Sequence, residues 1–313
     1  MSDHGLTTNV LSDVVLPIAL AVITLGMGLA LTGADFRRVV KMPRAVAVGL
    51  GAQLVVLPLL AALVATIFAY TVGITRDLVL GILILACCPG GATSNLVTWL
   101  ARADAALSVS LTSVTSLASA LTTPFAFLLL VDLLLGESAA LNVSFIDMAK
   151  LVVAIVAIPI LVGMQIRKRR PAFAARIEKP LRIASVALLA VLVAGIIAAN
   201  ASSFWALAAR SVPMSLALNA LALAAGWGLA RALALPPAQA RAISIEVGFQ
   251  NGTLGIALAV TQLGSPEAAI VPGFYSLVMF VTGGALAWWW ARDAARAVPV
   301  EAPAREATVE ARP

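Results

Sequence analysis

The sequence predicts an all-α polytopic membrane protein, on three observations: its composition, the recurrence of its apolar runs and the one-sided placement of its basic residues. Of 313 residues, 61% are hydrophobic and only 12% are charged, and the mean hydropathy is +1.02. Water-soluble domains are about half apolar and about a quarter charged. A water-soluble core cannot take up so much apolar surface, so we expect a lipid bilayer to solvate part of this chain.

Apolar runs long enough to cross a bilayer, about 20 residues each, recur along the chain. We predict nine such spans, at residues 11–32, 44–70, 77–101, 105–134, 147–167, 181–199, 211–233, 239–263 and 268–291. The leader 1–10 is acidic and lacks a clear cleavage site, so we expect the first run to be retained as a helix rather than removed as a signal peptide. Residues 293–313 are rich in Ala, Pro, Glu and Arg, which is typical of a disordered tail.

Basic residues gather in alternate connections between the predicted spans. All but three of the 21 lie in the connections near 37–44, 102, 167–182 and 231–241 or in the C-terminal tail; the exceptions are Arg76, Lys150 and Arg210. We expect a multi-pass protein of the inner (plasma) membrane. Because cytoplasmic loops carry the excess of Lys and Arg, its N-terminal tail would lie outside and its C-terminal tail in the cytoplasm. This dispersed charge argues against nucleic acid as a partner, and no obligatory protein partner is evident.

Two of the predicted spans are interrupted by residues that break helices. The run 77–101 contains CCPGGATSN from Cys87 to Asn95, and the run 239–263 contains IEVGFQNGT from Ile245 to Thr253. Proline removes a backbone donor, and glycine raises the cost of remaining helical. We therefore expect both helices to break inside the bilayer, where freed backbone groups must face protein or water.

The two predicted breaks lie five spans apart, so their helices cross the membrane in opposite directions. Paired breaks at corresponding positions of two halves indicate an inverted-repeat transporter. A repeat of five plus five helices that lacks its first helix would give nine spans with the breaks at these positions.

Glu246 is the one acidic residue that falls deep within a predicted span. An ionisable group at that depth is costly, so a functional role is the first hypothesis. The alternative is that Glu246 ends a helix and faces cytoplasmic water, five residues after Arg241.

Hydroxyl side chains recur at helical spacing on one face of the run 105–134, at Ser108, Thr112, Thr115, Ser116 and Ser119. We expect the last three to form a helix–helix seam, where small residues let backbones approach. The first two lie next to the broken span.

Ser108 and Thr112 are placed to direct their hydroxyls at Ser94 and Asn95. With Glu246, these residues supply one carboxylate among neutral oxygens, a set that suits a hard monovalent cation such as Na⁺. The N-termini of half-helices at the breaks would favour an anionic solute. The residues alone therefore indicate a cation-coupled transporter of a small organic anion.

At these residues the chain resembles the bile acid:sodium symporter family and looks like a nine-span bacterial-type member. The similar stretches are CCPGGATSN with the LARADAALSVSLTSVTSLASALTTP that follows, IEVGFQNGTLGIALA from Ile245, MGLALTGADFRRVVKMP from Met27, and the element from Gln53 to Pro58. The resemblance extends from about residue 12 to 292.

This resemblance implies a core domain with two broken, crossing helices and a flatter panel domain. The panel would comprise the segments 11–32, 147–167 and 181–199, and the core the segments 44–134 and 211–291. It also implies symport of sodium with an organic anion by alternating access.

The resemblance further implies two sodium sites that share Glu246. One would use Ser94, Asn95, Ser108 and Thr112; the other would use Gln53, Gln250 and carbonyls near Val247 and Phe249. The substrate would contact Thr93, Asn251, Gly252, Met279 and Phe280 near the crossing.

The chain departs from the family pattern mainly on the surface assigned to the substrate. Ala92-Thr93-Ser94 exchanges small and hydroxyl residues, Gly252-Thr253 stands where Ser-Gly is common, and Met279-Phe280 stands where many members carry polar side chains. Family substrates also include smaller carboxylates, so the resemblance implies a solute that is bile-acid-like or a smaller carboxylate such as pantoate or a keto acid.

Three other readings remain at this point. A transporter of the same fold could couple to protons through Glu246. A membrane protein that binds or signals without transporting is a second reading. A membrane enzyme is a third, but the sequence has no paired intramembrane aspartates, no His-Glu-x-x-His and no Gly-x-Ser-x-Gly. We therefore expect no enzymatic activity.

Overall fold

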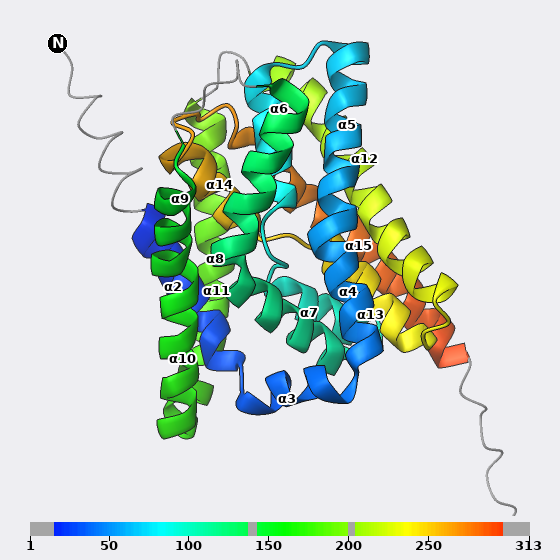
Figure 1. Ribbon diagram of the computed structural model, residues 1–313. Helices are drawn as coiled ribbons and strands as arrows, with labels where there is room; N and C mark the ends of the chain where they lie inside the picture. The colour runs from blue at the N-terminus through cyan, green and yellow to red at the C-terminus, as the bar shows by residue number, and fades with distance from the viewer. Residues whose placement is uncertain (1–15, 137–142, 200–203, 297–313) are drawn as a thin grey trace, which may run out of the picture.

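The computed structural model describes residues 16–136, 143–199 and 204–296, and helices dominate these ranges (Figure 1). The helices are α2 (Leu16–Ala30), α3 (Gly33–Lys41), α4 (Pro43–Gly51), η2 (Ala52–Val56), α5 (Leu57–Val72), α6 (Arg76–Ala86), α7 (Thr93–Leu100), α8 (Ala105–Leu135), α9 (Phe145–Val152), η4 (Val153–Ala157), α10 (Ile158–Arg169), α11 (Pro171–Ala199), α12 (Phe204–Ala232), α13 (Pro237–Gly248), α14 (Gly252–Thr261) and α15 (Ile270–Arg296). The predicted tails lie outside the described residues, except that α15 continues through Arg296.

Five helices in the described ranges are long and apolar enough to cross a membrane: Pro43–Val72, Ala105–Leu135, Phe145–Arg169, Phe204–Ala232 and Ile270–Asp293. A sixth is counted if α2 and α3, which meet at a bend of 66°, form one span. The all-α membrane-protein class is therefore confirmed. The count of nine spans stays a prediction, because two of the predicted spans are split into short half-helices and α11, which contains the predicted span 181–199, is not among the helices counted.

The α2–α3 bend has a local cause in the sequence. Thr32 has extended backbone angles (φ −130°, ψ 160°), and its backbone N–H donates to the Asp35 carboxylate at 2.7 Å. This arrangement is a capping box, which starts a new helix at Gly33. Asp35 also pairs with Arg38 at 2.8 Å, so the carboxylate is fully engaged. As a result α3 runs across one end of the bundle (Figure 1).

Two π-helical turns interrupt long helices, and each is followed by a proline. Ala52–Val56 precedes Pro58, and Val153–Ala157 precedes Pro159. A proline cannot donate to the preceding turn, so the helix accommodates it by a wider turn. In the second case, Thr24 of α2 donates to the Ile155 carbonyl at 2.6 Å and satisfies the loosened backbone.

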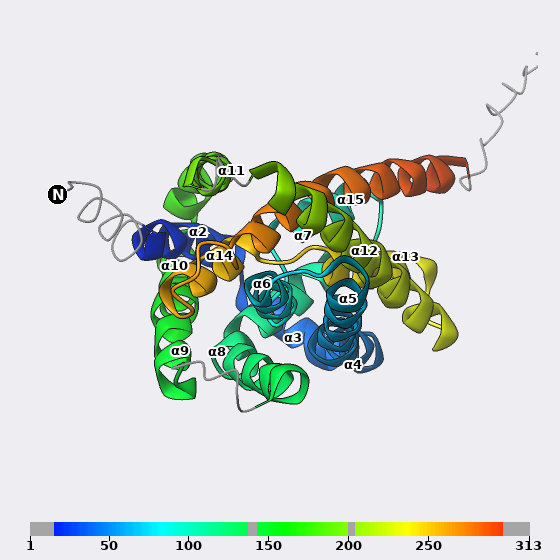
Figure 2. The same ribbon diagram turned by 90° about the horizontal axis from the view of Figure 1, so that it is seen from above.

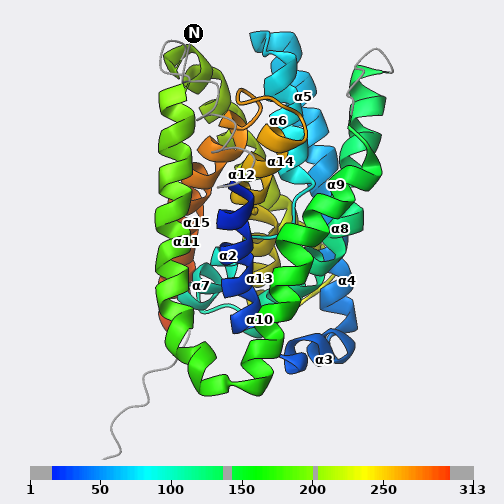
Figure 3. The same cartoon turned by 90° about the vertical axis from the view of Figure 1, so that its left-hand side faces the viewer.

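The helices α2, α10 and α11 contact one another and stand together along one side of the molecule (Figures 2 and 3). They lie in the three predicted panel segments, the second of which also contains α9 and η4, and their role as a separate domain stays a proposal. The half-helices α6, α7 and α13 lie in the other group, with α4, α5, α8, α12 and α15 (Figure 2). The half-helix α14 contacts α6 and α15 and also reaches α2.

The hydroxyls predicted to form a helix seam on α8 are all buried. Thr115 and Ser119 donate to carbonyls of their own helix, and Ser116 approaches the sulfur of Met27 on α2 at 3.5 Å. These contacts are those expected of a helix–helix seam.

The contact between α2 and α10 depends on two glycines. A Cβ on Gly28 would collide with the backbone of Ile160, and a Cβ on Gly163 would lie 2.5 Å from the Leu25 carbonyl oxygen. Both neighbours are backbone atoms, so the helices themselves would have to separate.

We expect Gly28→Ala to destabilise the protein by about 1–3 kcal/mol, the usual cost of overpacking. The melting temperature of the detergent-solubilised protein measures this loss. Gly51→Ala is the matched control, because nothing lies within 4 Å of a Cβ at Gly51. Equal melting temperatures for both variants would contradict the backbone contact.

Candidate functional site

The two predicted breaks occur where expected and lie side by side at the centre of the bundle (Figure 1). Residues 87–92 separate α6 from α7, and residues 249–251 separate α13 from α14. The unwound segments form an antiparallel bridge between Gly90 and Gln250. In it the Gly91 N–H donates to the Phe249 carbonyl at 2.9 Å, and the Asn251 N–H donates to the Pro89 carbonyl at 3.0 Å.

Side chains satisfy the other carbonyls freed by the break in α6. Thr123 of α8 donates to the Cys87 carbonyl at 2.7 Å, and Gln53 donates to the Cys88 carbonyl at 3.2 Å. Polar backbone at membrane depth therefore faces protein, as the absence of water in a bilayer core requires. Gln53 reaches this position from the π-helical turn η2, a feature often found at functional sites.

Glu246 lies on α13, is 1% exposed and is surrounded by hydroxyl groups. Ser94 of α7 donates to its carboxylate at 2.8 Å, and two residues of α8, Ser108 and Thr112, donate at 2.9 and 2.6 Å. The Asn95 amide oxygen accepts from Ser108 at 2.9 Å. All five residues of the first predicted ion site are therefore together, and the alternative of Glu246 facing cytoplasmic water is wrong.

Gly90 lets the backbone of the α6–α7 break approach this carboxylate. A Cβ at Gly90 would collide with Oε1 of Glu246 and lie 3.1 Å from its Cδ. The bridge and the carboxylate cluster are thus in direct contact, so the position of each constrains the other.

Residues of the second predicted site also lie together. The Gln53 amide donates to Oε1 of Gln250 at 2.8 Å, and the Gln250 amide donates to the Val247 carbonyl at 2.7 Å. The carbonyl of Phe249 accepts from the bridge instead. The carboxylate of Glu246 makes its hydrogen bonds to α7 and α8 rather than to this group.

The residues predicted to contact substrate divide into accessible and buried ones. Thr93 is partly exposed at the start of α7, and Phe280 is 37% exposed, with its ring edge-on to Phe249. Asn251 is buried and caps α14 by accepting from the Leu254 N–H at 3.1 Å.

The other two predicted substrate residues, Gly252 and Met279, are both buried. A Cβ at Gly252 would collide with the hydroxyl of Ser276, so this position brings α14 and α15 close together.

Sequence reasoning missed a polar group behind the α13 break. Asn219 of α12 donates to the Gly248 carbonyl at 2.8 Å, Tyr275 of α15 donates to the same carbonyl at 3.0 Å, and Thr282 donates to the Asn219 amide oxygen. Asn219 is the only amide in the run 211–233, which is the signal that could have pointed to it.

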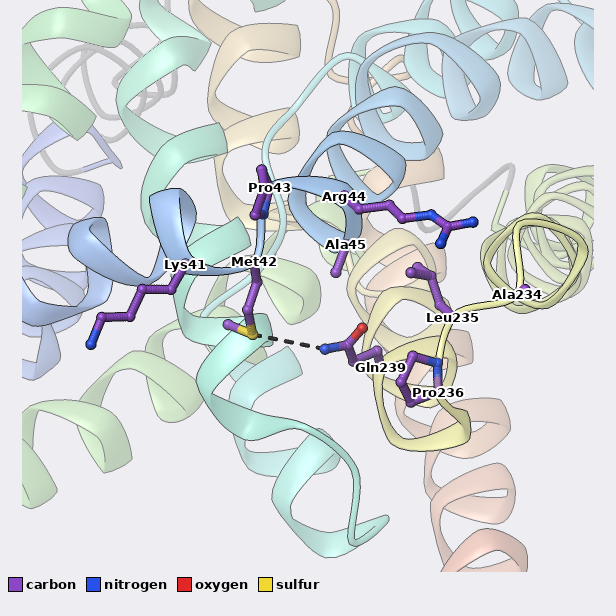
Figure 4. Close-up of a pocket in the computed structure, with 9 residues that line it drawn as sticks. All are labelled: Lys41, Met42, Pro43, Arg44, Ala45, Ala234, Leu235, Pro236 and Gln239. Carbon is purple, nitrogen blue, oxygen red and sulfur yellow. Dashed lines mark hydrogen bonds between the residues drawn. The ribbon is translucent and has the colours of Figure 1, made fainter.

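A separate pocket of about 320 Å³ opens at the end of the bundle where α3 meets α4 (Figure 4). Its lining comes from the α3–α4 junction, including Met42 and Arg44, and from the α12–α13 loop and the start of α13, including Leu235 and Gln239. The side chain of Lys41 points away from the centre of the group drawn (Figure 4). The pocket shares no residue with the Glu246 cluster, so it is not part of the candidate ion site.

Comparison with known proteins identifies the family of this chain. The Sodium Bile acid symporter family matches residues 17–207. A probable sodium/metabolite cotransporter, BASS1 of rice chloroplasts, is 32% identical over 268 residues, which cover 85% of this chain and 63% of the rice protein. The uncharacterized sodium-dependent transporter YocS of Bacillus subtilis is 30% identical over 275 residues, covering 88% of this chain and 82% of YocS.

The P3 protein of Homo sapiens is 33% identical over 227 residues, which cover 71% of this chain and 45% of the human protein. The chain thus spans under two thirds of the length of the rice and human relatives. The match to the family covers more than half of the chain and includes the first broken helix and α8. The chain belongs to the sodium bile acid symporter family, whose members are sodium-dependent transporters rather than enzymes.

Proposed function

We propose that this protein is a secondary active transporter that couples the entry of sodium to the uptake of an organic anion by alternating access. The observation that carries the proposal is the buried carboxylate of Glu246, which α7, α8 and α13 surround with neutral oxygens. Sodium is a substrate here, carried together with the anion.

The oxygens around Glu246 fit a sodium ion better than a divalent one. Ser94, Ser108 and Thr112 supply hydroxyls, Asn95 supplies an amide oxygen, and Glu246 supplies the single negative charge. Hard cations take oxygen ligands, and one carboxylate balances one monovalent charge. An unpaired charge in a protein interior costs several kcal/mol, so binding sodium would stabilise this arrangement.

The second group supports a proposal of two sodium ions. Gln53, Gln250 and the Val247 and Phe249 carbonyls lie next to the Glu246 cluster, and Glu246 would serve both ions. The two glutamine side chains now bond to each other, so ion binding there would exchange an amide–amide hydrogen bond for ion contacts.

For the substrate we propose a bile-acid-like anion or a smaller carboxylate such as pantoate or a keto acid. The rice relative is a probable sodium/metabolite cotransporter, a name that specifies no metabolite. Thr93 and Phe280 supply accessible surface near the crossing, and the half-helices α7 and α14 begin there, with N-termini that favour negative charge.

We propose the inner (plasma) membrane as the location, with the N-terminus outside and the C-terminus in the cytoplasm. Most of the basic residues lie in α3, around the α10–α11 junction, or at Arg231 and Arg241 on either side of the α12–α13 loop, and these parts lie toward the same end of the molecule (Figure 1). The positive-inside rule assigns that end to the cytoplasm.

Replacing external sodium with choline at fixed pH should reduce uptake into proteoliposomes to the level of empty vesicles. A thermal-shift screen of organic anions, with and without sodium, supplies the solute for this measurement. Uptake that persists in choline and follows an imposed pH gradient would replace sodium coupling with proton coupling through Glu246.

A further inference from the structure

The strongest feature that the proposed ion sites leave unexplained is the buried polar group of Asn219, Tyr275 and Thr282. Asn219 and Tyr275 are completely buried, and both donate to one atom, the carbonyl oxygen of Gly248. Gly248 is the last residue of α13, two positions after Glu246. Carbonyls at the end of a helix have no partner within the helix, so this one would otherwise be unsatisfied inside the protein.

Three consecutive carbonyls at this point are each held by a different part of the protein. The Val247 carbonyl accepts from the Gln250 side chain, and the Phe249 carbonyl accepts from the N–H of Gly91 in the opposite break. The Gly248 carbonyl, between them, is held by α12 and α15. The turn at Val247–Phe249 is thus held on one side by Gln250 and Gly91, near the proposed ion sites, and on the other side by α12 and α15.

The backbone conformation at Phe249 links the direction of the Gly248 carbonyl to the direction of the next carbonyl, that of Phe249. Phe249 is extended (φ −106°, ψ 100°), and successive carbonyls of extended backbone point to opposite sides. Fixing the Gly248 carbonyl toward Asn219 and Tyr275 therefore directs the next carbonyl toward the crossing.

Steric contacts reinforce this hold. A Cβ at Gly248 would collide with Leu223 of α12. The ring of Phe249 lies against Gly283 of α15, where a Cβ would collide with it. Neither residue of the turn can shift toward α12 or α15 without displacing a packed group.

Thr282 connects this group to the partly exposed face of α15. Its hydroxyl donates to the amide oxygen of Asn219, which orients the Asn219 N–H group toward Gly248. Thr282 itself is partly exposed and lies in the next turn of the helix after Met279 and Phe280, two residues proposed to contact substrate.

We propose that Asn219, Tyr275 and Thr282 are positioning residues that set the sodium affinity of the turn from Glu246 to Gln250. Through Thr282 they also connect this turn to the partly exposed face of α15 near Met279 and Phe280. The inference rests on the proposed sodium coupling. These residues touch no ion in this scheme: they act through the Gly248 carbonyl.

The test measures sodium binding by the purified full chain, as the NaCl concentration that gives half of the sodium-induced rise in melting temperature at constant ionic strength with choline chloride. Tyr275→Phe removes one of the two donors to Gly248 and should raise that concentration about threefold to tenfold. Thr282→Val keeps the side-chain shape and should raise it about twofold to fivefold, because the Asn219 amide loses its orienting partner.

Thr66→Val is the matched control for Thr282→Val. Both threonines are partly buried on long helices and donate to the carbonyl four residues earlier, but Thr66 has no bond resembling that to Asn219. The control should leave the sodium midpoint within twofold of the unchanged protein.

A purely structural role would lower the melting temperature in choline without moving the sodium midpoint. That result for Tyr275→Phe and Thr282→Val would overturn the inference and leave sodium coupling intact. If the unchanged protein shows no sodium-induced stabilisation and no sodium-dependent uptake, the proposed function itself fails, and the inference fails with it.

Discussion

Glu246→Gln should abolish sodium-induced stabilisation and sodium-dependent uptake while leaving a folded protein. The substitution preserves the volume of the side chain and an oxygen that can accept from Ser94, Ser108 or Thr112, but it removes the only charge of the cluster. The attraction between two unit charges about 4 Å apart is about 4 kcal/mol at an effective dielectric of about 20. That energy corresponds to a roughly thousandfold loss of sodium affinity.

The same variant should melt at or above the temperature of the unchanged protein when sodium is absent, because a buried carboxylate has been neutralised. Thermal unfolding in NaCl and in choline chloride gives both comparisons. Glu267→Gln is the control, since it makes the same chemical change in the α14–α15 connection, where Glu267 accepts from Thr75. A Glu246→Gln variant with an unchanged sodium midpoint would refute the ion site.

The sequence predicted the places where the helices break because the cause is local. Pro89 and the two glycines after it cannot continue a helix at low cost, whatever surrounds them. The position of Glu246 near the second break was equally visible, since one carboxylate in a long apolar run has few structural explanations. The start of the α3 helix also has a local cause, the capping box of Thr32 and Asp35. A search for long apolar runs does not detect this helix, because it is short and polar.

The partners of these residues were not predictable from composition or spacing. Gln53 illustrates the reason: the π-helical turn that carries it adds a residue to the helix, and one residue rotates the following side chains by about 100°. An apolar pattern read with a constant period therefore cannot say which face Gln53 occupies. Its assignment came from resemblance, and the structure places its amide on Gln250 and on the Cys88 carbonyl.

The partners in the polar group of Asn219, Tyr275 and Thr282 were even less predictable from the sequence. Asn219 and Tyr275 lie 56 residues apart, and their meeting depends on how α12 packs against α15. The sequence marks Asn219 as a single amide in an apolar run and Tyr275 as a tyrosine followed by Ser276 in another. Only the folded arrangement shows that both donate to Gly248.

Gly90→Ala should weaken sodium binding strongly although it removes no ligand side chain. The added methyl group would occupy the space of Oε1 of Glu246, which accepts from Thr112 at 2.6 Å. The carboxylate would have to move away from Thr112 or the bridge with Gln250 would have to open. Losing one hydrogen bond to a charged group costs about 1.5–3 kcal/mol, which corresponds to about a tenfold to 150-fold higher sodium midpoint.

Gly284→Ala separates this effect from a general intolerance of glycine substitution. Gly284 lies on α15, and nothing lies within 4 Å of a Cβ there, so its variant should keep the sodium midpoint and gain slightly in helix stability. The sodium-dependent rise in melting temperature and sodium-dependent uptake should fall together in Gly90→Ala. If Gly90→Ala bound sodium like the unchanged protein, the carboxylate would not be held against the α6–α7 break when the ion binds, and the coupling of that break to Glu246 would have to be abandoned.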